Sequence, residues 1–95
     1  MRIIISPRAE SDLSEIWHYI SEDNPEAAEG VLAKIKLTII NLANSPKMGH
    51  RRDNFSPGLR SFPVGLYLVF YREMRDRMEV VHVLHGARDI TPGLF

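Results

Sequence analysis

Residues 58–89, GLRSFPVGLYLVFYREMRDRMEVVHVLHGARD, hold the most strongly β-forming runs of this 95-residue chain. Leucine, β-branched and aromatic residues dominate 66–71 and 80–84, and the β-branched and aromatic types are enriched in strands. Short segments with glycine or charged residues separate the runs, as in hairpin connections. We therefore predict three consecutive antiparallel strands, at 58–63, 65–72 and 78–85, followed by an exposed tail.

The first half of the chain predicts a short strand and two helices. Residues 2–6, RIIIS, are rich in isoleucine and indicate a strand. Ser6-Pro7 and Asn24-Pro25 each combine an N-cap residue with a proline at the first helical position. They predict helices at 7–22 and 25–44.

The resulting order, β-α-α-β-β-β, indicates an α+β fold. Two helices that follow each other directly form a helical hairpin, and three consecutive strands form a meander. We predict that the hairpin packs on one face of a mostly antiparallel, four-stranded sheet.

The composition is that of a globular protein. Hydrophobic residues make up 44% of the chain and charged residues 25%, as in ordinary folded domains. The chain has no cysteine, which excludes disulfides and fits a reducing compartment. Its apolar stretches are shorter than the ~20 residues that a membrane helix needs. We expect a single soluble, cytoplasmic domain spanning 1–95.

Charge is unevenly distributed although the net charge is zero. Residues 1–46 carry four basic and seven acidic side chains, and residues 47–95 carry eight basic and five acidic ones. The basic half contains the predicted sheet. One interpretation is an anionic partner on that side, and the other is ordinary solvated charge.

Apolar spacing predicts a core between the hairpin and the sheet. In the second helix, Leu37 and Ile40 widen the apolar stripe beyond one face. Either this helix is deeply buried or part of it binds a partner. We expect seven residues to be largely buried: Trp17, Ile20, Leu32, Ile35, Ile39, Leu68 and Phe70. Of these, Leu68 and Phe70 should lie on the face of the sheet that is turned to the helices.

His82 and His85 form the one spacing that suggests a metal site. On a helix, this spacing would put both imidazoles on one face. On a strand, residues three apart point to opposite faces, so the two rings cannot share an ion. Strict alternation would place His82 on the same face as Val80 and Leu84. We predict no metal site and no cofactor.

A ribonuclease is the enzyme class that the basic sheet suggests. RNA cleavage needs a base, an acid and cations over the phosphate. The sheet offers Arg60, Arg72, His85 and Arg88, but no close histidine–carboxylate pair is evident. Arg60 begins a strand and Arg88 follows the last one, so we expect both at one rim. Arg88 has an alternative role in a local ion pair with Asp89. We predict no catalytic residues.

Two segments resemble the ParE branch of the RelE/ParE toxin superfamily. The first is GLRSFPVGLYLVFYR, followed by a charged turn and EVVHVLHGARDI. The second, SPRAESDLSEIWHYISEDNPEAA, is similar to the opening helical hairpin of that family. The resemblance covers nearly the whole chain and agrees with the predicted element order.

The resemblance implies a toxin of a type II toxin–antitoxin system. ParE-type toxins inhibit DNA gyrase by binding, whereas RelE-type toxins cut mRNA on the ribosome with lysines, arginines and often a C-terminal tyrosine. Here Lys47 is the only lysine after the second helix, and the tail TPGLF lacks a tyrosine. This departure favours gyrase inhibition, and the mRNA endonuclease stays the alternative.

The resemblance also implies an antitoxin encoded by a neighbouring gene, with DNA contacted only through that antitoxin. For the target we expect contacts from the basic rim and its histidine, namely Arg60, Arg72, His85 and Arg88. For the antitoxin we expect contacts from apolar residues of the helical hairpin, namely Trp17, Leu37 and Ile40.

Overall fold

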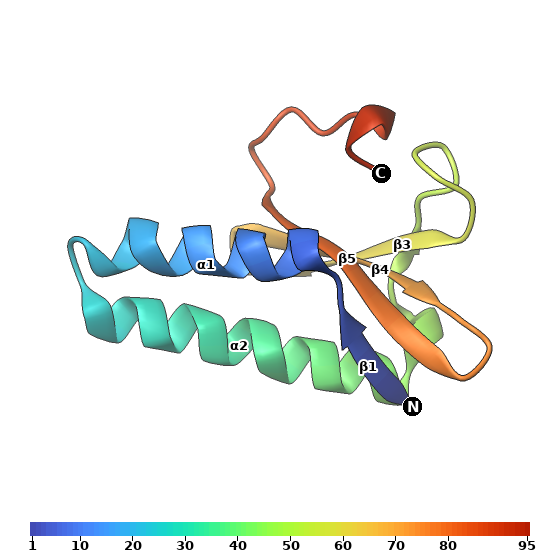
Figure 1. Cartoon of the computed structure of the whole chain (residues 1–95), viewed down its shortest axis with the longest axis horizontal. Coiled ribbons are helices and arrows are strands. Elements are labelled where there is room, and N and C mark those ends of the chain that lie inside the picture. The colour runs from blue at the N-terminus through green and yellow to red at the C-terminus, as the bar shows by residue number, and fades with distance from the viewer.

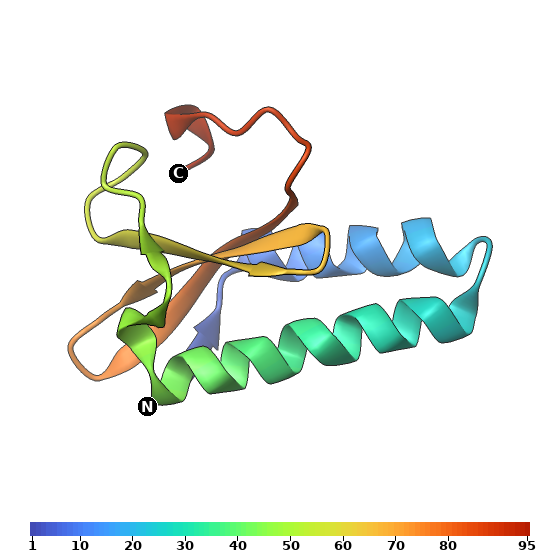
Figure 2. The same cartoon turned by 180° about the vertical axis from the view of Figure 1, so that it is seen from behind.

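A computed structural model describes residues 1–95 as two helices packed on one face of a five-stranded sheet. Helices α1 (Pro7–Ser21) and α2 (Pro25–Asn44) run antiparallel, side by side, as a hairpin that extends to one side of the sheet (Figures 1 and 2). The α+β fold and the helical hairpin are thus confirmed. Neither helix is long and apolar enough to cross a membrane.

Both helices begin at the predicted cap residues. The Ser6 hydroxyl accepts a hydrogen bond from the Ala9 N–H at 3.1 Å, and the Asn24 side chain accepts one from the Ala27 N–H at 3.1 Å. Each cap is followed by a proline, whose missing N–H is not needed in the first turn. Local chemistry alone therefore fixes where the helices start.

The sheet has five strands in the order β1-β5-β4-β3-β2, so the prediction of four strands is wrong. The strands are β1 (Arg2–Ile5), β2 (His50–Arg51), β3 (Leu59–Val64), β4 (Tyr67–Glu73) and β5 (Arg77–His85). The additional strand, β2, is a two-residue edge strand between α2 and β3. β1 is parallel to β5, and the other neighbours are antiparallel.

The main core lies between the helices and the sheet. Ile35 is fully buried at its centre and Ile39 is 4% exposed, as predicted. Ile20 and Leu32 pack at the margin of this core and are only partly buried, and Trp17 is also only partly buried. The sheet contributes Val69, Tyr71, Met78, Val80 and Val83.

A second, smaller core covers the opposite face of the sheet. It is built on Leu59, Phe70, Val81 and Leu84, and Leu68 packs against it. The prediction that Leu68 and Phe70 face the helices is therefore wrong. The helix-facing residues of β4 are their neighbours Val69 and Tyr71. Both faces of β4 are apolar, so the sequence pattern alone does not distinguish them.

A β-bulge in β5 explains why strict alternation fails there. Phe70 pairs with His82 but Tyr71 pairs with Val80, which leaves Val81 as an extra residue. Val80 consequently faces the helices, whereas His82 and Leu84 face the second core. The predicted common face for all three residues is wrong.

The C-terminal segment folds back over the second core instead of forming an exposed tail. It contains the short 3₁₀ turn η2 (Pro92–Leu94), which lies above the sheet on the side away from α2 (Figure 1). The Phe95 ring lies 4.8 Å from the Phe70 ring, centroid to centroid. Arg8 of α1 donates a hydrogen bond to the Leu94 carbonyl at 3.1 Å.

Candidate functional site

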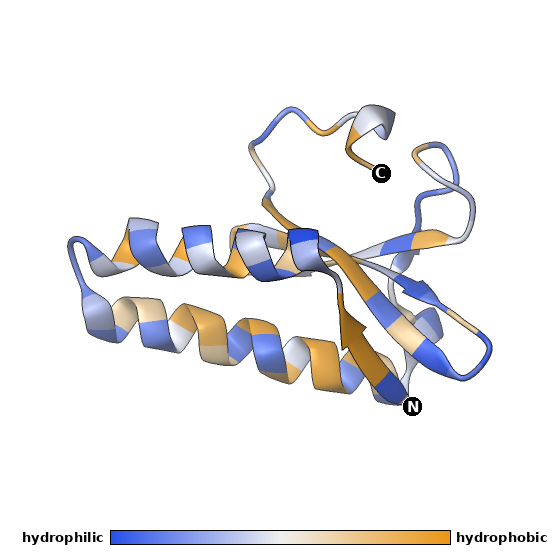
Figure 3. Cartoon of the chain, viewed as in Figure 1, coloured by the Kyte–Doolittle hydropathy of each residue, from blue (hydrophilic) through white to orange (hydrophobic).

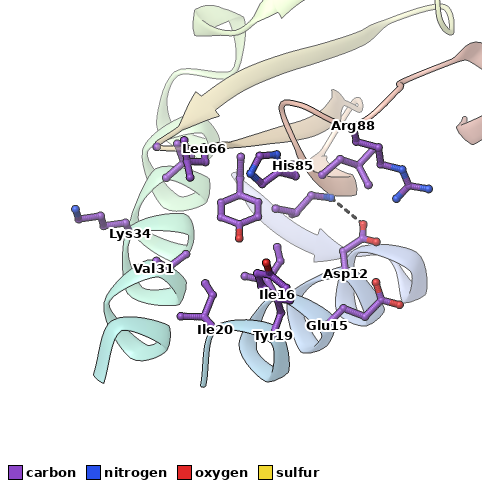
Figure 4. A pocket seen from close by; sticks show the side chains of 15 residues that line it. Asp12, Glu15, Ile16, Tyr19, Ile20, Val31, Lys34, Leu66, His85 and Arg88 are labelled. Atoms are coloured by element: carbon purple, nitrogen blue, oxygen red, sulfur yellow. Dashed lines mark hydrogen bonds between the residues drawn. The ribbon is translucent and has the colours of Figure 1, made fainter. Parts of the chain in front are cut away.

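A groove of about 790 Å³ lies between the helical hairpin and one end of the sheet. It is bordered by α1, by the N-terminal half of α2, by the β3–β4 turn and by the end of β5 (Figure 4). Nine of its 15 lining residues are hydrophobic. Tyr19 and Leu66 stand at its opposite walls and are 77% and 71% exposed. An apolar groove rimmed by polar residues is typical of a binding surface.

Charged side chains of both signs surround this apolar floor. Glu15 comes from α1, Lys34 from α2 and Arg88 from the segment after β5 (Figure 4). None of the three forms an ion pair within the chain. These side chains are therefore available to a partner, and they would favour one that carries both signs of charge.

Asp12 joins α1 to the edge of β5 next to the groove. Its Oδ2 accepts the Val83 N–H at 2.9 Å and lies 2.6 Å from His82 Nδ1 (Figure 4 draws the first contact). An ionised carboxylate can only accept, so Nδ1 carries the hydrogen in this pair. The expectation that no histidine–carboxylate pair is within reach is wrong. The two residues are 70 positions apart in sequence, so no local pattern could have indicated the pair.

Asp12 and His82 are only 13% and 10% exposed at their side chains. The Phe95 ring stands edge-on to the imidazole, with centroids 5.6 Å apart. Asp12 also holds a backbone group, which is the role of a clamp between a helix and a strand. β1 pairs β5 only up to Val80, and beyond that point Ser6 and Asp12 supply the hydrogen bonds that a neighbouring strand would make.

His85 lies at the groove, on the face opposite to His82. Its Nδ1 accepts the Ala87 N–H at 3.0 Å, and its ring packs edge-on against Tyr67 with centroids 5.4 Å apart. The two histidines thus point to different faces, as strand geometry predicts. No group of three or more His, Asp or Glu side chains lies close enough to hold a metal ion.

The four residues predicted to contact the target do not form one rim. Arg60 pairs with Tyr71 and, through it, aligns with Val80 near the start of β5. Arg88 follows the far end of β5, where His85 aligns with Tyr67. The separation along the strands is at least about 13 Å. The expected common rim of Arg60 and Arg88 is wrong, because β3 and β5 run in the same direction.

The side chains of Arg60 and Arg72 both donate hydrogen bonds to other residues of the chain. Arg60 donates to the Gly49 carbonyl at 2.9 Å, and Arg72 donates to the Ser56 hydroxyl and, at 3.4 Å, to the Pro57 carbonyl. Both hold the segment 47–57 onto the sheet. His85 and Arg88, by contrast, line the groove together. The ion pair with Asp89, which was the alternative role of Arg88, is not formed.

The three residues predicted to contact an antitoxin do not line the groove. Trp17 is half-buried on α1. Leu37 and Ile40 are 59% and 51% exposed on α2. Sequence reasoning missed Tyr19 and Leu66, although an aromatic residue on an otherwise polar helix face and a leucine directly after a turn glycine were available signals.

Comparison with known proteins gives a consistent result. A family model described as the ParE toxin of the type II toxin–antitoxin system parDE matches residues 3–90. Toxin ParE1 of Mycobacterium tuberculosis is 32% identical over 95 residues, which is 98% of this chain and 97% of the relative. Toxin ParE1 of Caulobacter vibrioides is 35% identical over 84 residues, covering 87% of this chain and 86% of that one.

The fold also has a solved counterpart. A structure described as the chromosomal ParDE TA system from P. aeruginosa superimposes with a TM-score of 0.75 and covers 90% of this chain and 95% of that one. Its sequence identity is 20%, so this likeness concerns the fold alone. The family match over residues 3–90 and the two relatives agree with each other. The chain therefore belongs to the ParE toxin family of type II toxin–antitoxin systems.

Proposed function

We propose that this chain inhibits DNA gyrase by binding to it, without catalysis, and that a cognate antitoxin neutralises it. The observation that carries the proposal is the make-up of the groove, where nine of 15 lining residues are hydrophobic and the charges lie at the margin. Apolar floors with polar rims are typical of protein-binding surfaces. A binding toxin only has to hold its target in one state.

The polar groups that a ribonuclease would use are already engaged in holding the fold. His82 is held by Asp12, and Arg60 and Arg72 donate to acceptors of the segment 47–57. His85 uses its Nδ1 to accept a backbone N–H. Acid–base catalysis typically contributes ~10²–10⁴-fold in rate and needs a side chain that reaches the substrate proton. The side chains of His82 and Asp12 are only 10% and 13% exposed. This arrangement favours binding over mRNA cleavage.

For the antitoxin, the groove is the surface that fits best. A segment that folds on binding would bury its apolar residues against Tyr19 and Leu66. Its charged residues would meet Glu15, Lys34 and Arg88. The antitoxin is proposed to be the product of a neighbouring gene, and the cytoplasm is the proposed site of action.

Within the groove margin, Arg88 and His85 are the proposed contacts to gyrase. Purified chain should inhibit DNA supercoiling by gyrase, and Arg88→Ala should raise the inhibitory concentration about tenfold, which is typical of a contact arginine. Arg75→Ala is the matched control, because Arg75 is exposed in the β4–β5 turn at the opposite end of the sheet and has no partner in the chain. Equal loss in both variants would exclude the groove margin from the target contact.

Primer extension on mRNA from cells expressing the toxin separates the two mechanisms. Gyrase inhibition predicts intact mRNA together with a DNA-damage response. Codon-spaced cuts in mRNA that precede any DNA-damage response would overturn the gyrase proposal in favour of the endonuclease.

A further inference from the structure

The side of α2 turned away from the core carries an apolar ridge that the chain itself does not cover. Ala28, Ile35 and Leu42, spaced by seven residues, are fully buried and define the inner face of α2. Gly30, Ala33, Leu37 and Ile40 lie on the opposite face, and all four are exposed. We call these four residues the outer ridge. α2 also carries more apolar positions than α1 (Figure 3).

The spacing of the outer ridge is that of a coiled-coil seam. Steps of three, four and three residues connect its members, as between positions a and d of successive heptads. Gly30 and Leu37 then occupy a positions, and Ala33 and Ile40 occupy d positions. Asn44, which is also exposed, takes the next a position. A single asparagine at position a specifies the register and oligomer state of a coiled coil, at a cost in stability.

Gly30 has no role in the packing of the chain itself. A Cβ added at this position would meet no atom within 4 Å. Glycine inside a helix costs about 1 kcal/mol relative to alanine, so it is unexplained within one chain. A second helix that approaches closely at this point would account for it.

The charges beside the ridge decide what can cover it. Glu29 and Lys36 lie on one flank, and Lys34 and Asn41 lie on the other. None of the three charged residues forms an ion pair within the chain. In a parallel pair of identical helices, the first flank of one copy meets the second flank of the other. Glu29 then faces Lys34 of the second copy, twice by symmetry.

An antiparallel pair of α2 helices cannot both bury the outer ridge and pair residues of opposite charge. The register that packs Leu37 on Ala33 of the second copy sets Lys34 against Lys34 and Lys36 against Lys36. The register that pairs Glu29 with Lys36 sets Leu37 against Glu26. Only the parallel arrangement buries the ridge and pairs opposite charges.

We propose that the outer ridge of α2 pairs with the outer ridge of a second copy of this chain, in parallel and about a two-fold axis. The contact is isologous, since each copy contributes the same residues. It is separate from the proposed gyrase function, which rests on the groove. Lys34 belongs to both surfaces, because it also lines the groove. The ridge is short, so the dimer dissociates on dilution.

Charge reversal tests this pairing in the full chain by sedimentation equilibrium. Wild type should show a monomer–dimer equilibrium. Glu29→Lys and Lys34→Glu should each weaken the dimer about tenfold, because two attractive pairs become repulsive. The double variant Glu29→Lys/Lys34→Glu should restore it. Lys36→Glu is the matched control, since its partner in the parallel register is Asn41, and its dimer should remain within about twofold of wild type.

The absence of native cysteine permits a second test of register. Leu37→Cys should form an intermolecular disulfide readily under mild oxidation, because paired a positions bring the two Cα atoms within the ~4.4–6.8 Å that a disulfide needs. A leucine side chain at position 30 has free space in the monomer, so Gly30→Leu should leave the melting temperature unchanged or raise it. In the dimer it should keep the two helices apart, so the double variant Gly30→Leu/Leu37→Cys should not form the cross-link.

Three results would overturn the proposal. The first is a chain that stays monomeric at the highest soluble concentration. The second is a charge swap that fails to restore a weakened dimer. The third is a ridge variant, Leu37→Lys, that leaves the mass unchanged but weakens antitoxin binding, because the ridge would then belong to the antitoxin. Gyrase inhibition by wild type is measured separately, so failure of this proposal and failure of the gyrase proposal are distinguishable.

Discussion

At the scale of single residues, the phenol of Tyr71 connects the end of α2 to the sheet. Its hydroxyl donates to the Pro46 carbonyl at 2.7 Å and accepts the Gly49 N–H at 2.9 Å. A Cβ on Gly49 would come within 2.9 Å of the Ser61 carbonyl oxygen, so only glycine allows this approach. Burial raises the pKa of the Tyr71 phenol above its usual 10.

This raised pKa predicts a loss of stability at alkaline pH. A group whose folded-state pKa exceeds its unfolded value stabilises the fold fully below about pH 10 and loses that contribution as the pH rises through the folded value. Urea denaturation from pH 8 to pH 11.5 should therefore show a falling midpoint. Tyr71→Phe should cost about 1–2 kcal/mol at pH 8, because the Gly49 N–H loses its acceptor. Its alkaline decline should be shallower, and parallel curves would contradict this account.

At the scale of elements, the Asp12 carboxylate clamps α1 to the part of β5 that β1 does not reach. Asp12→Ala would leave the Val83 N–H and His82 Nδ1 without their acceptor. We expect a loss of about 2–4 kcal/mol in the free energy of unfolding, from two unsatisfied groups in a mostly buried place. Urea denaturation measures it. Glu15→Ala, one turn further along α1 and exposed, is the control and should change stability by less than ~0.5 kcal/mol.

Element prediction from the sequence succeeded where the determinants are local. The caps Ser6 and Asn24 set both helix starts, and the strand runs of 58–85 were found within two residues of their observed ends. The prediction of elements failed where contacts between distant parts of the chain determine the structure. The two-residue strand β2 exists only because β3 pairs with it, and the bulge at Val81 reverses the faces of β5. The alternation of residues along a strand does not predict the extra residue of a β-bulge.

At the scale of the whole molecule, the sheet has a core on each face, and the groove opens at one end of the larger core. Of the four residues predicted from the sequence to contact the target, His85 and Arg88 lie at this groove. The position of Arg60 relative to His85 and Arg88 could not be predicted from the sequence, because it depends on the relative direction of β3 and β5. Nor could the sequence predict the groove itself, which exists only once the hairpin lies beside the β3–β4 turn.

The groove also predicts how the molecule responds to its antitoxin. A ligand that binds only the folded state stabilises it by about 4 kcal/mol at a thousandfold excess over Kd. For a domain of roughly 100 residues, this corresponds to a rise of roughly 15–30 °C in melting temperature. Calorimetry with the antitoxin, which we propose is encoded by a neighbouring gene, should show that rise.

Two variants locate the effect in the groove. Leu66→Asp places a charge at a 71% exposed position of the groove wall, so it should leave the melting temperature of the free chain nearly unchanged while removing most of the rise. Met48→Asp, at a 47% exposed position outside the groove, should retain the full rise. An unchanged rise in Leu66→Asp would exclude the groove as the antitoxin site. No rise in wild type at saturating antitoxin would exclude the partnership itself, because binding that is selective for the folded state must stabilise it.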